Sequence, residues 1–284
     1  GYQALQSLND GYDNVAIGSG AHKRNQTGYR NTAIGTIAMF SENNASGYNN
    51  VAVGYKSLYF LTTGDSNVGV GNTSLQNITS GTNNVAIGNG AGLGNAEQSE
   101  NVYIGYLAGY RNSKGSSVVH IGADAGAYTT GSYNTFVGRY AGQGGTGDST
   151  PYASGENNTA VGFQALDDFT TGHSNVAVGK SALTALTTGD YVTAVGLSAG
   201  SNVTNGRFNT FYGYNAGGNS NASHVVAIGY NVYGSGASNK SYGVYIGSQA
   251  GRYDTSGEGT IAIGYNAVKC DSGGGNNPSG CIGI

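Results

Sequence analysis

The sequence predicts an all-β protein, a parallel β-solenoid (β-roll) of about sixteen coils with about 17 residues in each. Two observations lead to this fold class. Glycine recurs at a nearly constant spacing along the whole chain, and each recurring glycine has the same kinds of neighbours on both sides. We therefore treat residues 1–284 as a single repeat domain.

The repeat is marked by a glycine that ends each tetrad of the Val-Ala-Ile-Gly type. Seventeen of these anchor glycines divide the chain into sixteen intervals, and ten of the intervals are 17 residues long. This period is too short for a helical repeat and fits one coil of a β-solenoid. The anchors are Gly1, Gly18, Gly35, Gly54, Gly71, Gly88, Gly105, Gly122, Gly138, Gly162, Gly179, Gly196, Gly213, Gly229, Gly247, Gly264 and Gly283.

A small residue follows three positions after nearly every anchor. It is usually alanine, as at Ala21, Ala38 and Ala91. A side chain that stacks on its own copy in the next coil, about 4.8 Å away, must fit a constant radius. We therefore predict a tight corner at this position, with the alanine pointing inward.

The residues before each anchor predict a short strand. The residue before the glycine is almost always β-branched, and valine or threonine stands two places earlier, as with Ile17 and Val15. These two positions share one strand face, which we predict to be the interior. The residue between them, Ala16 in this copy, is never charged. A strand without polar alternation is typical of burial on both faces, so this middle residue predicts packing against sibling chains.

Asparagine recurs immediately before the strands, as at Asn14, Asn31 and Asn50, and a glycine stands three residues earlier in most copies. Asparagine and glycine are turn residues, and an asparagine amide can bond to nearby backbone groups. In stacked coils these amides would also align into a ladder.

These repeat units resemble two known groups of proteins. Residues 14–18 (Asn-Val-Ala-Ile-Gly) and 31–35 (Asn-Thr-Ala-Ile-Gly) resemble the head repeats of trimeric autotransporter adhesins. The opening Gly-Tyr-Gln-Ala-Leu of residues 1–5 and the Thr-Thr-Gly-x-x-Asn linkers resemble the glycine-rich repeats of phage tail-fibre-like proteins. The resemblance covers essentially the whole chain, although the period of 17 is longer than that of the adhesin head repeat.

The resemblance implies a left-handed β-roll that assembles as a homotrimer. It also implies an extracellular location, on a virion tail fibre or a bacterial cell surface, and a role in attachment to a host or another surface. The expected partners are sibling chains and a cell-surface glycan or protein receptor. Sequence reasoning leaves open which of the two settings applies and which receptor is bound.

The largest break in the period lies between Gly138 and Gly162 and predicts an insertion loop over residues 142–157. Loops that interrupt a repeat often carry function, although a tolerated surface loop is the simpler interpretation. Tyrosine offers an apolar ring with a polar tip, so it suits contact with a receptor as well as stacking that stiffens the coils. Our candidate contact residues near the insertion are Tyr110, Tyr128, Tyr140 and Tyr152.

The sequence offers little that indicates catalysis or a cofactor. Cys270 and Cys281 could form a disulfide that closes the segment 270–281, or remain two free thiols. His120 takes a middle strand position, where packing in the interior or at an interface is favoured over an ion site on a trimer axis. Carboxylates such as Asp167 and Asp168 have no recurring partners, and no nucleophile elbow or phosphate-binding loop is present. We expect no enzyme, no cofactor and no bound metal.

Composition excludes several other classes. The 52 glycines lack a three-residue period, which excludes collagen, and the low charge with many β-branched residues argues against disorder. A net charge of −3 gives no basic footprint for nucleic acid. No apolar run of about 18 residues predicts insertion of this segment into a membrane. The chain begins inside the repeat pattern, so we expect targeting and anchoring segments outside it.

Three functions are compatible with these features. A structural or adhesive segment of an extracellular trimeric fibre is favoured. A tailspike-like polysaccharide depolymerase would need a pair of carboxylates across one glycosidic bond, and the sequence does not indicate such a pair. An ice-binding solenoid would need a regular threonine array, whereas threonine starts the strand in only some coils, as at Thr32 and Thr159.

Overall fold

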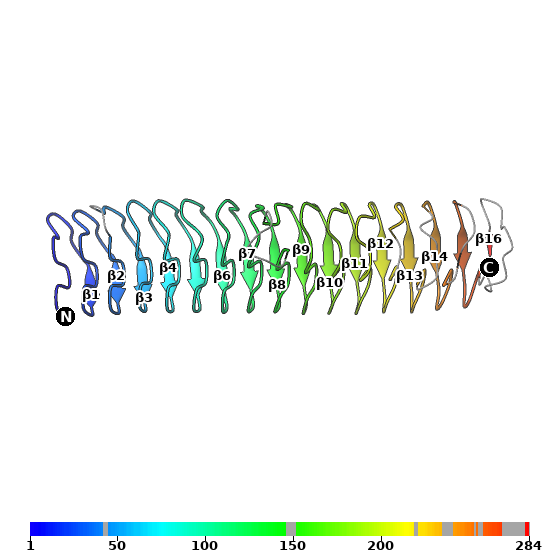
Figure 1. Cartoon of the computed structure of the whole chain (residues 1–284), viewed down its shortest axis with the longest axis horizontal. Helices are drawn as coiled ribbons and strands as arrows, with labels where there is room; N and C mark the ends of the chain where they lie inside the picture. Colours follow the sequence, from blue (N-terminus) through cyan, green and yellow to red (C-terminus); the bar gives the residue numbers. More distant parts are fainter. Residues whose placement is uncertain are drawn as a thin grey trace. The chain divides into compact units, whose positions relative to one another are not determined.

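In a computed structural model, the chain folds as an all-β parallel β-solenoid of about 13 turns, without a helix in the residues described (Figure 1). The predicted all-β parallel β-solenoid is therefore confirmed. The structure describes residues 1–41, 45–145, 152–218, 221–234, 241–252, 254, 258–268 and 282–283. The chain divides into two compact units, Gly1–Arg139 and Tyr140–Ile284, which we describe in turn.

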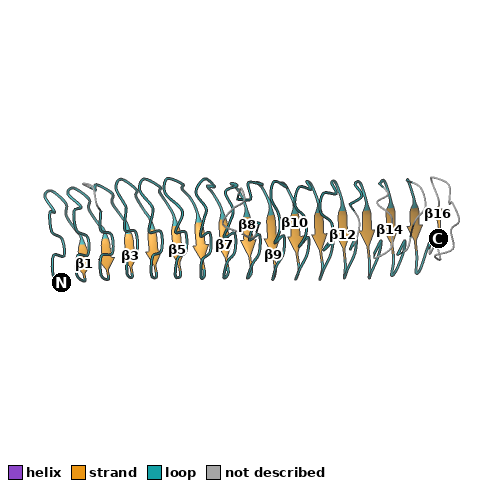
Figure 2. Ribbon diagram, in the orientation of Figure 1, coloured by secondary structure: helices purple, strands orange, loops and turns teal. Residues whose placement is uncertain are grey.

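The first unit contains eight parallel strands in chain order (Figure 2). Each strand pairs in register with the next, so equal positions of the repeat lie side by side, as Ala16 does with Ala33. The strands are β1 (Val15–Ile17), β2 (Thr32–Ile34), β3 (Val51–Val53), β4 (Val68–Val70), β5 (Val85–Ile87), β6 (Val102–Ile104), β7 (Val119–Ile121) and β8 (Thr135–Val137).

The second unit repeats this arrangement. Its strands also run parallel and pair each with the next, as Ala177 of one strand pairs with Ala194 of the following one. They are β9 (Thr159–Val161), β10 (Val176–Val178), β11 (Thr193–Val195), β12 (Thr210–Tyr212), β13 (Val226–Ile228), β14 (Val244–Ile246), β15 (Ile261–Ile263) and β16 (Ile282–Gly283).

The anchor glycines end the strands because no other residue fits there. At Gly88 the backbone φ is 137°, a region that side-chain-bearing L-residues rarely adopt. A Cβ at this position would also collide with the carbonyl oxygen of Gly105 in the next coil. Two independent constraints, dihedral and steric, therefore require glycine at this anchor.

The interior of each coil is bounded by the residues that the sequence marked as corners and turns. Ala21, Ala38 and Ala91 are fully buried, which confirms the predicted inward corner. The asparagine ladder is confirmed as well. The Nδ2 of Asn67 donates to Asn50 Oδ1 (3.1 Å) and to the carbonyl of Gly81 (2.8 Å), while Asn67 Oδ1 accepts the backbone N–H of Asn84 (3.0 Å).

The predicted orientation of the strands is wrong. The middle residues face the interior, and Ala33 is fully buried. The flanking β-branched residues face outward, and Ile17 and Ile34 are 58% and 37% exposed. The physical reason lies in the residue before the strand. Asn31 must turn its amide inward to join the ladder, and side chains alternate along a strand, so Ala33 points inward and its neighbours point outward.

The observed strand orientation also determines where His120 lies. It lies inside the coil, fully buried and stacked on Phe136 with ring centroids 5.0 Å apart. A side chain in this position cannot meet its copies on a trimer axis, so the axial ion site considered from the sequence is excluded. Neither ring nitrogen of His120 has a hydrogen-bond partner, and burial lowers its pKa from 6.5 to about 3.

Acid is expected to destabilise the first unit through this histidine. The native ring stays neutral down to a pH of about 3, whereas the unfolded ring takes up a proton below about 6.5. The free energy of unfolding should therefore be highest above pH 6.5 and fall as the pH drops through this window. We expect His120→Phe to reduce the loss of thermal midpoint between pH 7 and 4 by about 5 °C. His173→Gln, at an exposed ring, is the control, and an equal effect of both variants would contradict the assignment.

Two positions of each coil share the space in the core: the middle residue of the strand and the residue after the corner. In most coils one of the two is large and the other is small. Where the middle strand residue is small, a large residue follows the corner in most coils, as with Ala160 and Leu166 or Ala177 and Leu183, and all four are buried. Ala86 and Ala194 are exceptions, with glycine after the corner, because a Cβ at Gly92 or Gly200 would meet the ring of Tyr103 or Phe211 in the next coil. Where the middle residue is aromatic, glycine replaces that leucine. This second arrangement pairs Tyr103 with Gly109, His120 with Gly126, Phe136 with Gly142, Phe211 with Gly217 and Tyr245 with Gly251.

Candidate interaction surfaces

The outward strand residues form a continuous apolar face in each unit. In strands β1 to β15 every outward position holds Val, Ile, Thr or Tyr, and no charged residue occurs there. Their exposure is substantial, as at Val15 (47%) and Ile263 (44%). In-register stacking places like residues side by side, so the face is flat and regular. We call these outward positions of β1–β8 and of β9–β15 the strand face of each unit.

Such a surface is unusual for an isolated soluble chain. Monomeric proteins rarely expose a contiguous apolar patch of more than a few hundred Å². The flanking strand residues, which the sequence pattern assigns to the core, thus form an exposed apolar surface in each unit that is available for contact with another molecule.

Stacked aromatic rings border the strand face. In the second unit Tyr191, Phe208, His224 and Tyr242 stack one on the next with centroid distances of 5.1, 5.0 and 4.8 Å. Tyr12, Tyr29 and Tyr48 do the same in the first unit, at 4.9 and 4.8 Å. Each inner ring has both faces covered by its neighbours, so these rows stiffen the coils and expose ring edges only.

The four predicted contact tyrosines do not form one row. Tyr110 and Tyr128 belong to the first unit, and Tyr140 and Tyr152 belong to the second. They occupy four different positions of the repeat and are all half-buried. The Arg111 guanidinium lies 4.9 Å from the Tyr110 ring centre, and Tyr140 meets Phe163 edge-on at 6.0 Å. Their role in receptor contact remains a prediction.

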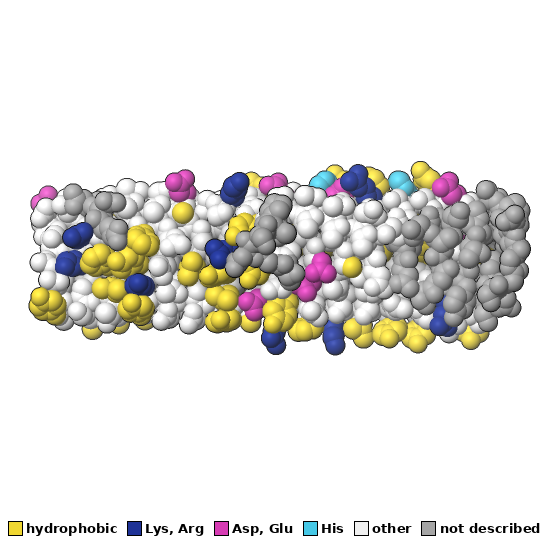
Figure 3. Space-filling view, viewed as in Figure 1, with side chains coloured by type: hydrophobic (Ala, Val, Ile, Leu, Met, Phe, Trp, Pro, Cys, Tyr) yellow, Lys and Arg dark blue, Asp and Glu magenta, His cyan; other side chains and the backbone are white. Residues whose placement is uncertain are grey.

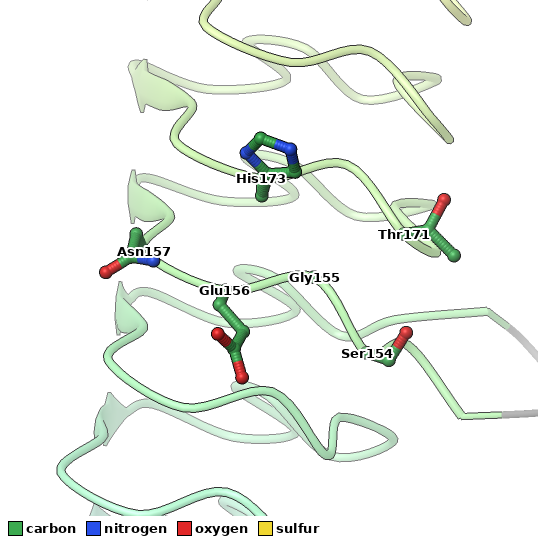
Figure 4. A pocket seen from close by; sticks show the side chains of 6 residues that line it. All are labelled: Ser154, Gly155, Glu156, Asn157, Thr171 and His173. Carbon is green, nitrogen blue, oxygen red and sulfur yellow. The ribbon is translucent and has the colours of Figure 1, made fainter.

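A hollow of about 390 Å³ lies beside the insertion loop, of which residues 146–151 fall outside the described part (Figure 4). Glu156 and His173 line it from neighbouring coils, with their side chains pointing in opposite directions in this view, and its lining is completed by Ser154, Gly155, Asn157 and Thr171. Sequence reasoning missed this hollow. The signal was available, because Glu156 and His173 occupy the same position of consecutive repeats.

The charges beside the hollow continue as a stacked row. His173 Nε2 lies 3.4 Å from Asp190 Oδ1, and Arg207 Nε lies 3.2 Å from Asp190 Oδ2. The hollow itself is lined by one carboxylate, Glu156, among its described residues. A glycosidase needs two carboxyl groups across the scissile bond, and the described lining of the hollow contributes one.

Asp167 has the most perturbed carboxyl group near the insertion. Burial, with a further contribution from the adjacent Asp168, raises its pKa to about 6. Gln164 Nε2 donates to Asp167 Oδ2 at 3.3 Å, and the backbone N–H of Gly144 donates to the Asp167 carbonyl at 2.9 Å. Asp167 therefore supports the start of the insertion loop through its backbone.

The remaining candidates are settled only in part. Cys270 and Cys281 lie outside the described residues, so their pairing remains a prediction. In the described part of the chain, no group of three or more His, Cys, Asp or Glu residues could hold a metal ion. Nor does that part contain a helix able to cross a membrane.

Comparison with known proteins gives no further assignment. No family model matches the chain, and no curated protein matches it.

Proposed function

We propose that this chain is a structural and adhesive segment of an extracellular homotrimeric fibre, in which the strand faces of three copies pack together. The observation that carries the proposal is the strand face itself, an uncharged surface of Val, Ile and Thr that each copy exposes. Burial of apolar area contributes about 25 cal/mol per Å², so a face that extends over many strands can hold chains together without any ion pair.

The proposal reverses the interface that the sequence first indicated. The middle strand residues fill the core, and the flanking residues, such as Ile87 and Ile104, meet the sibling chains. The resemblance to trimeric adhesin heads and tail-fibre-like repeats supports three copies, and it supports a place on a virion tail fibre or a bacterial surface. The proposal includes sixteen coils for the sixteen glycine intervals, attachment to a host or another surface, and no catalytic activity.

The mass in solution tests the assembly. We expect light scattering on the 28.7 kDa chain to give three times that mass over a wide range of concentrations. Ile87→Glu/Ile104→Glu places charges on the strand face and should shift the mass to one chain, because burying an unpaired carboxylate costs several kcal/mol. Circular dichroism should remain that of the folded protein.

A matched control separates the strand face from the rest of the surface. Gln76→Glu/Leu93→Glu alters two half-buried positions in the same part of the first unit, outside the strands, and should leave the mass at three chains. A wild-type monomer, or an equal loss of assembly in both double variants, would contradict the proposal.

A second candidate function uses the same face. Thr32, Thr135, Thr159, Thr193 and Thr210 all occupy outward strand positions, which favours the ice-binding alternative more than the sequence alone did. Ice binding requires this face to be free, whereas the trimer buries it. A monomer that produces thermal hysteresis would identify an ice-binding solenoid, and we expect the trimer to show none.

A further inference from the structure

Positive charge is concentrated near the start of the chain. The coils from Gly18 to Gly71 contain four Lys or Arg and two Asp or Glu, a net charge of +2, whereas the rest of the chain contains eight and thirteen, a net charge of −5. Of the two carboxylates in these coils, Asp65 accepts the backbone N–H of Tyr48 at 2.9 Å, and Glu42 lies outside the described residues. The coils around β2 and β3 therefore carry a local charge opposite to that of the whole chain.

The same coils carry a cluster of aromatic rings away from the strands. Phe40 and Tyr59 stack with centroids 5.2 Å apart, and Phe60 meets Tyr59 edge-on at 4.6 Å. All three side chains are half-buried. Figure 3 shows hydrophobic side chains gathered with Lys and Arg over the coils near the N-terminus. The rings are anchored in the coil and still present part of their surface to solvent.

The lysines of this region are held against the rings. Lys23 Nζ lies 5.9 Å from the centre of Phe40, and Lys56 Nζ lies 5.4 Å from the centre of Tyr59. Lys23 also donates to Gln3 Oε1 at 2.7 Å. Among the described residues no carboxylate is within ion-pair distance of either lysine. A cation over a ring is positioned but keeps its full charge for an incoming anion.

We propose that the aromatic–basic patch, consisting of Lys23, Phe40, Lys56, Tyr59 and Phe60, binds an acidic polysaccharide. Exposed ring surface packs against the apolar C–H face of a sugar, and the two ammonium groups pair with carboxylate or sulfate groups on that sugar or the next one. This inference names the ligand class for the attachment role proposed above and rests on that role. It does not depend on the number of chains in the assembly.

Binding to immobilised alginate, a polyuronate, and to heparin, a sulfated chain, tests the patch, with neutral dextran as the uncharged probe. We expect the wild type to bind at least one acidic chain and not dextran. Lys23→Gln/Lys56→Gln should weaken binding about tenfold, with the difference disappearing at high salt. Tyr59→Ser should weaken it about fivefold at low and high salt alike, because packing on a ring is not screened.

The control is Lys114→Gln/Lys180→Gln, which removes the same charge elsewhere and includes a lysine 5.9 Å from the Phe163 ring. It should bind like the wild type. Equal losses in both lysine pairs, equal binding to dextran, or tighter binding to single-stranded DNA or anionic vesicles would overturn the proposal. Light scattering on each variant separates the two proposals. Patch variants should remain trimeric, and strand-face variants should bind the acidic chain even as monomers.

Discussion

Phe211→Ala and Gly217→Leu are each expected to destabilise the second unit strongly, and together they should restore most of its stability. Phe211 is buried, and its removal should cost about 3–5 kcal/mol of the free energy of unfolding by leaving a cavity. A Cβ at Gly217 would collide with the Phe211 ring. A leucine there overpacks the core and should lower the free energy of unfolding by about 1–3 kcal/mol or more.

The double variant recreates the arrangement found in other coils of the same unit. Without the Phe211 ring, the leucine introduced at position 217 would have the place that Leu166 and Leu183 occupy beside Ala160 and Ala177. The φ of 67° at Gly217 is close to the 50° of Leu183, so the backbone already accepts a leucine, at a cost of about 1 kcal/mol. We expect the double variant to lie within about 2 kcal/mol of the wild type.

Urea unfolding of the four proteins measures the coupling between the two sites. The control pair is Phe211→Ala with Ser198→Leu, which adds a leucine at another residue with positive φ, half-buried and outside the core. It should give no rescue. Additive losses in the Phe211–Gly217 cycle would show that the two positions do not share one space, and would refute the pairing of large and small residues in the core.

Gly88→Ala is expected to prevent normal stacking of the coils that contain β4, β5 and β6. At a φ of 137° an alanine is strained by about 1–3 kcal/mol, and its Cβ meets backbone that has no side chain to move aside. The neighbouring anchors Gly71 and Gly105 adopt nearly the same φ, 136° and 135°. Because both neighbouring coils have the same backbone geometry, a shift of one of them cannot relieve the strain. We expect a loss of more than about 3 kcal/mol.

Gly20→Ala is the matched control for this anchor. Its φ is 65°, and the nearest atom to an added Cβ is Ile37 Cγ2 at 3.0 Å, the end of a side chain that can move. The expected cost is about 1 kcal/mol. Thermal unfolding followed by circular dichroism compares the two variants. Similar midpoints for Gly20→Ala and Gly88→Ala would show that the anchor position tolerates a side chain.

The sequence groups the residues of the strand face correctly, but it does not show whether that face lies inside or outside the coil. The sequence pattern places positions such as Val15 and Ile17 on one strand face and predicts that face to be the interior, whereas the structure exposes it. The aromatic–basic patch was missed. Lys23, Phe40 and Tyr59 each stand two residues after a corner residue, and aligning that position across repeats would have placed them in neighbouring coils.

The sequence by itself determined the parallel solenoid, the glycine anchors, the inward corner alanines and the asparagine ladder, because each of these depends on one residue type that recurs at one position. Only the tertiary structure decided which strand face is inside and how the core is filled. Side-chain alternation allows either face of a three-residue strand to be buried. The choice was made by the inward amide of residues such as Asn31 and by a narrow interior, where an aromatic ring such as Phe211 has space only beside a glycine.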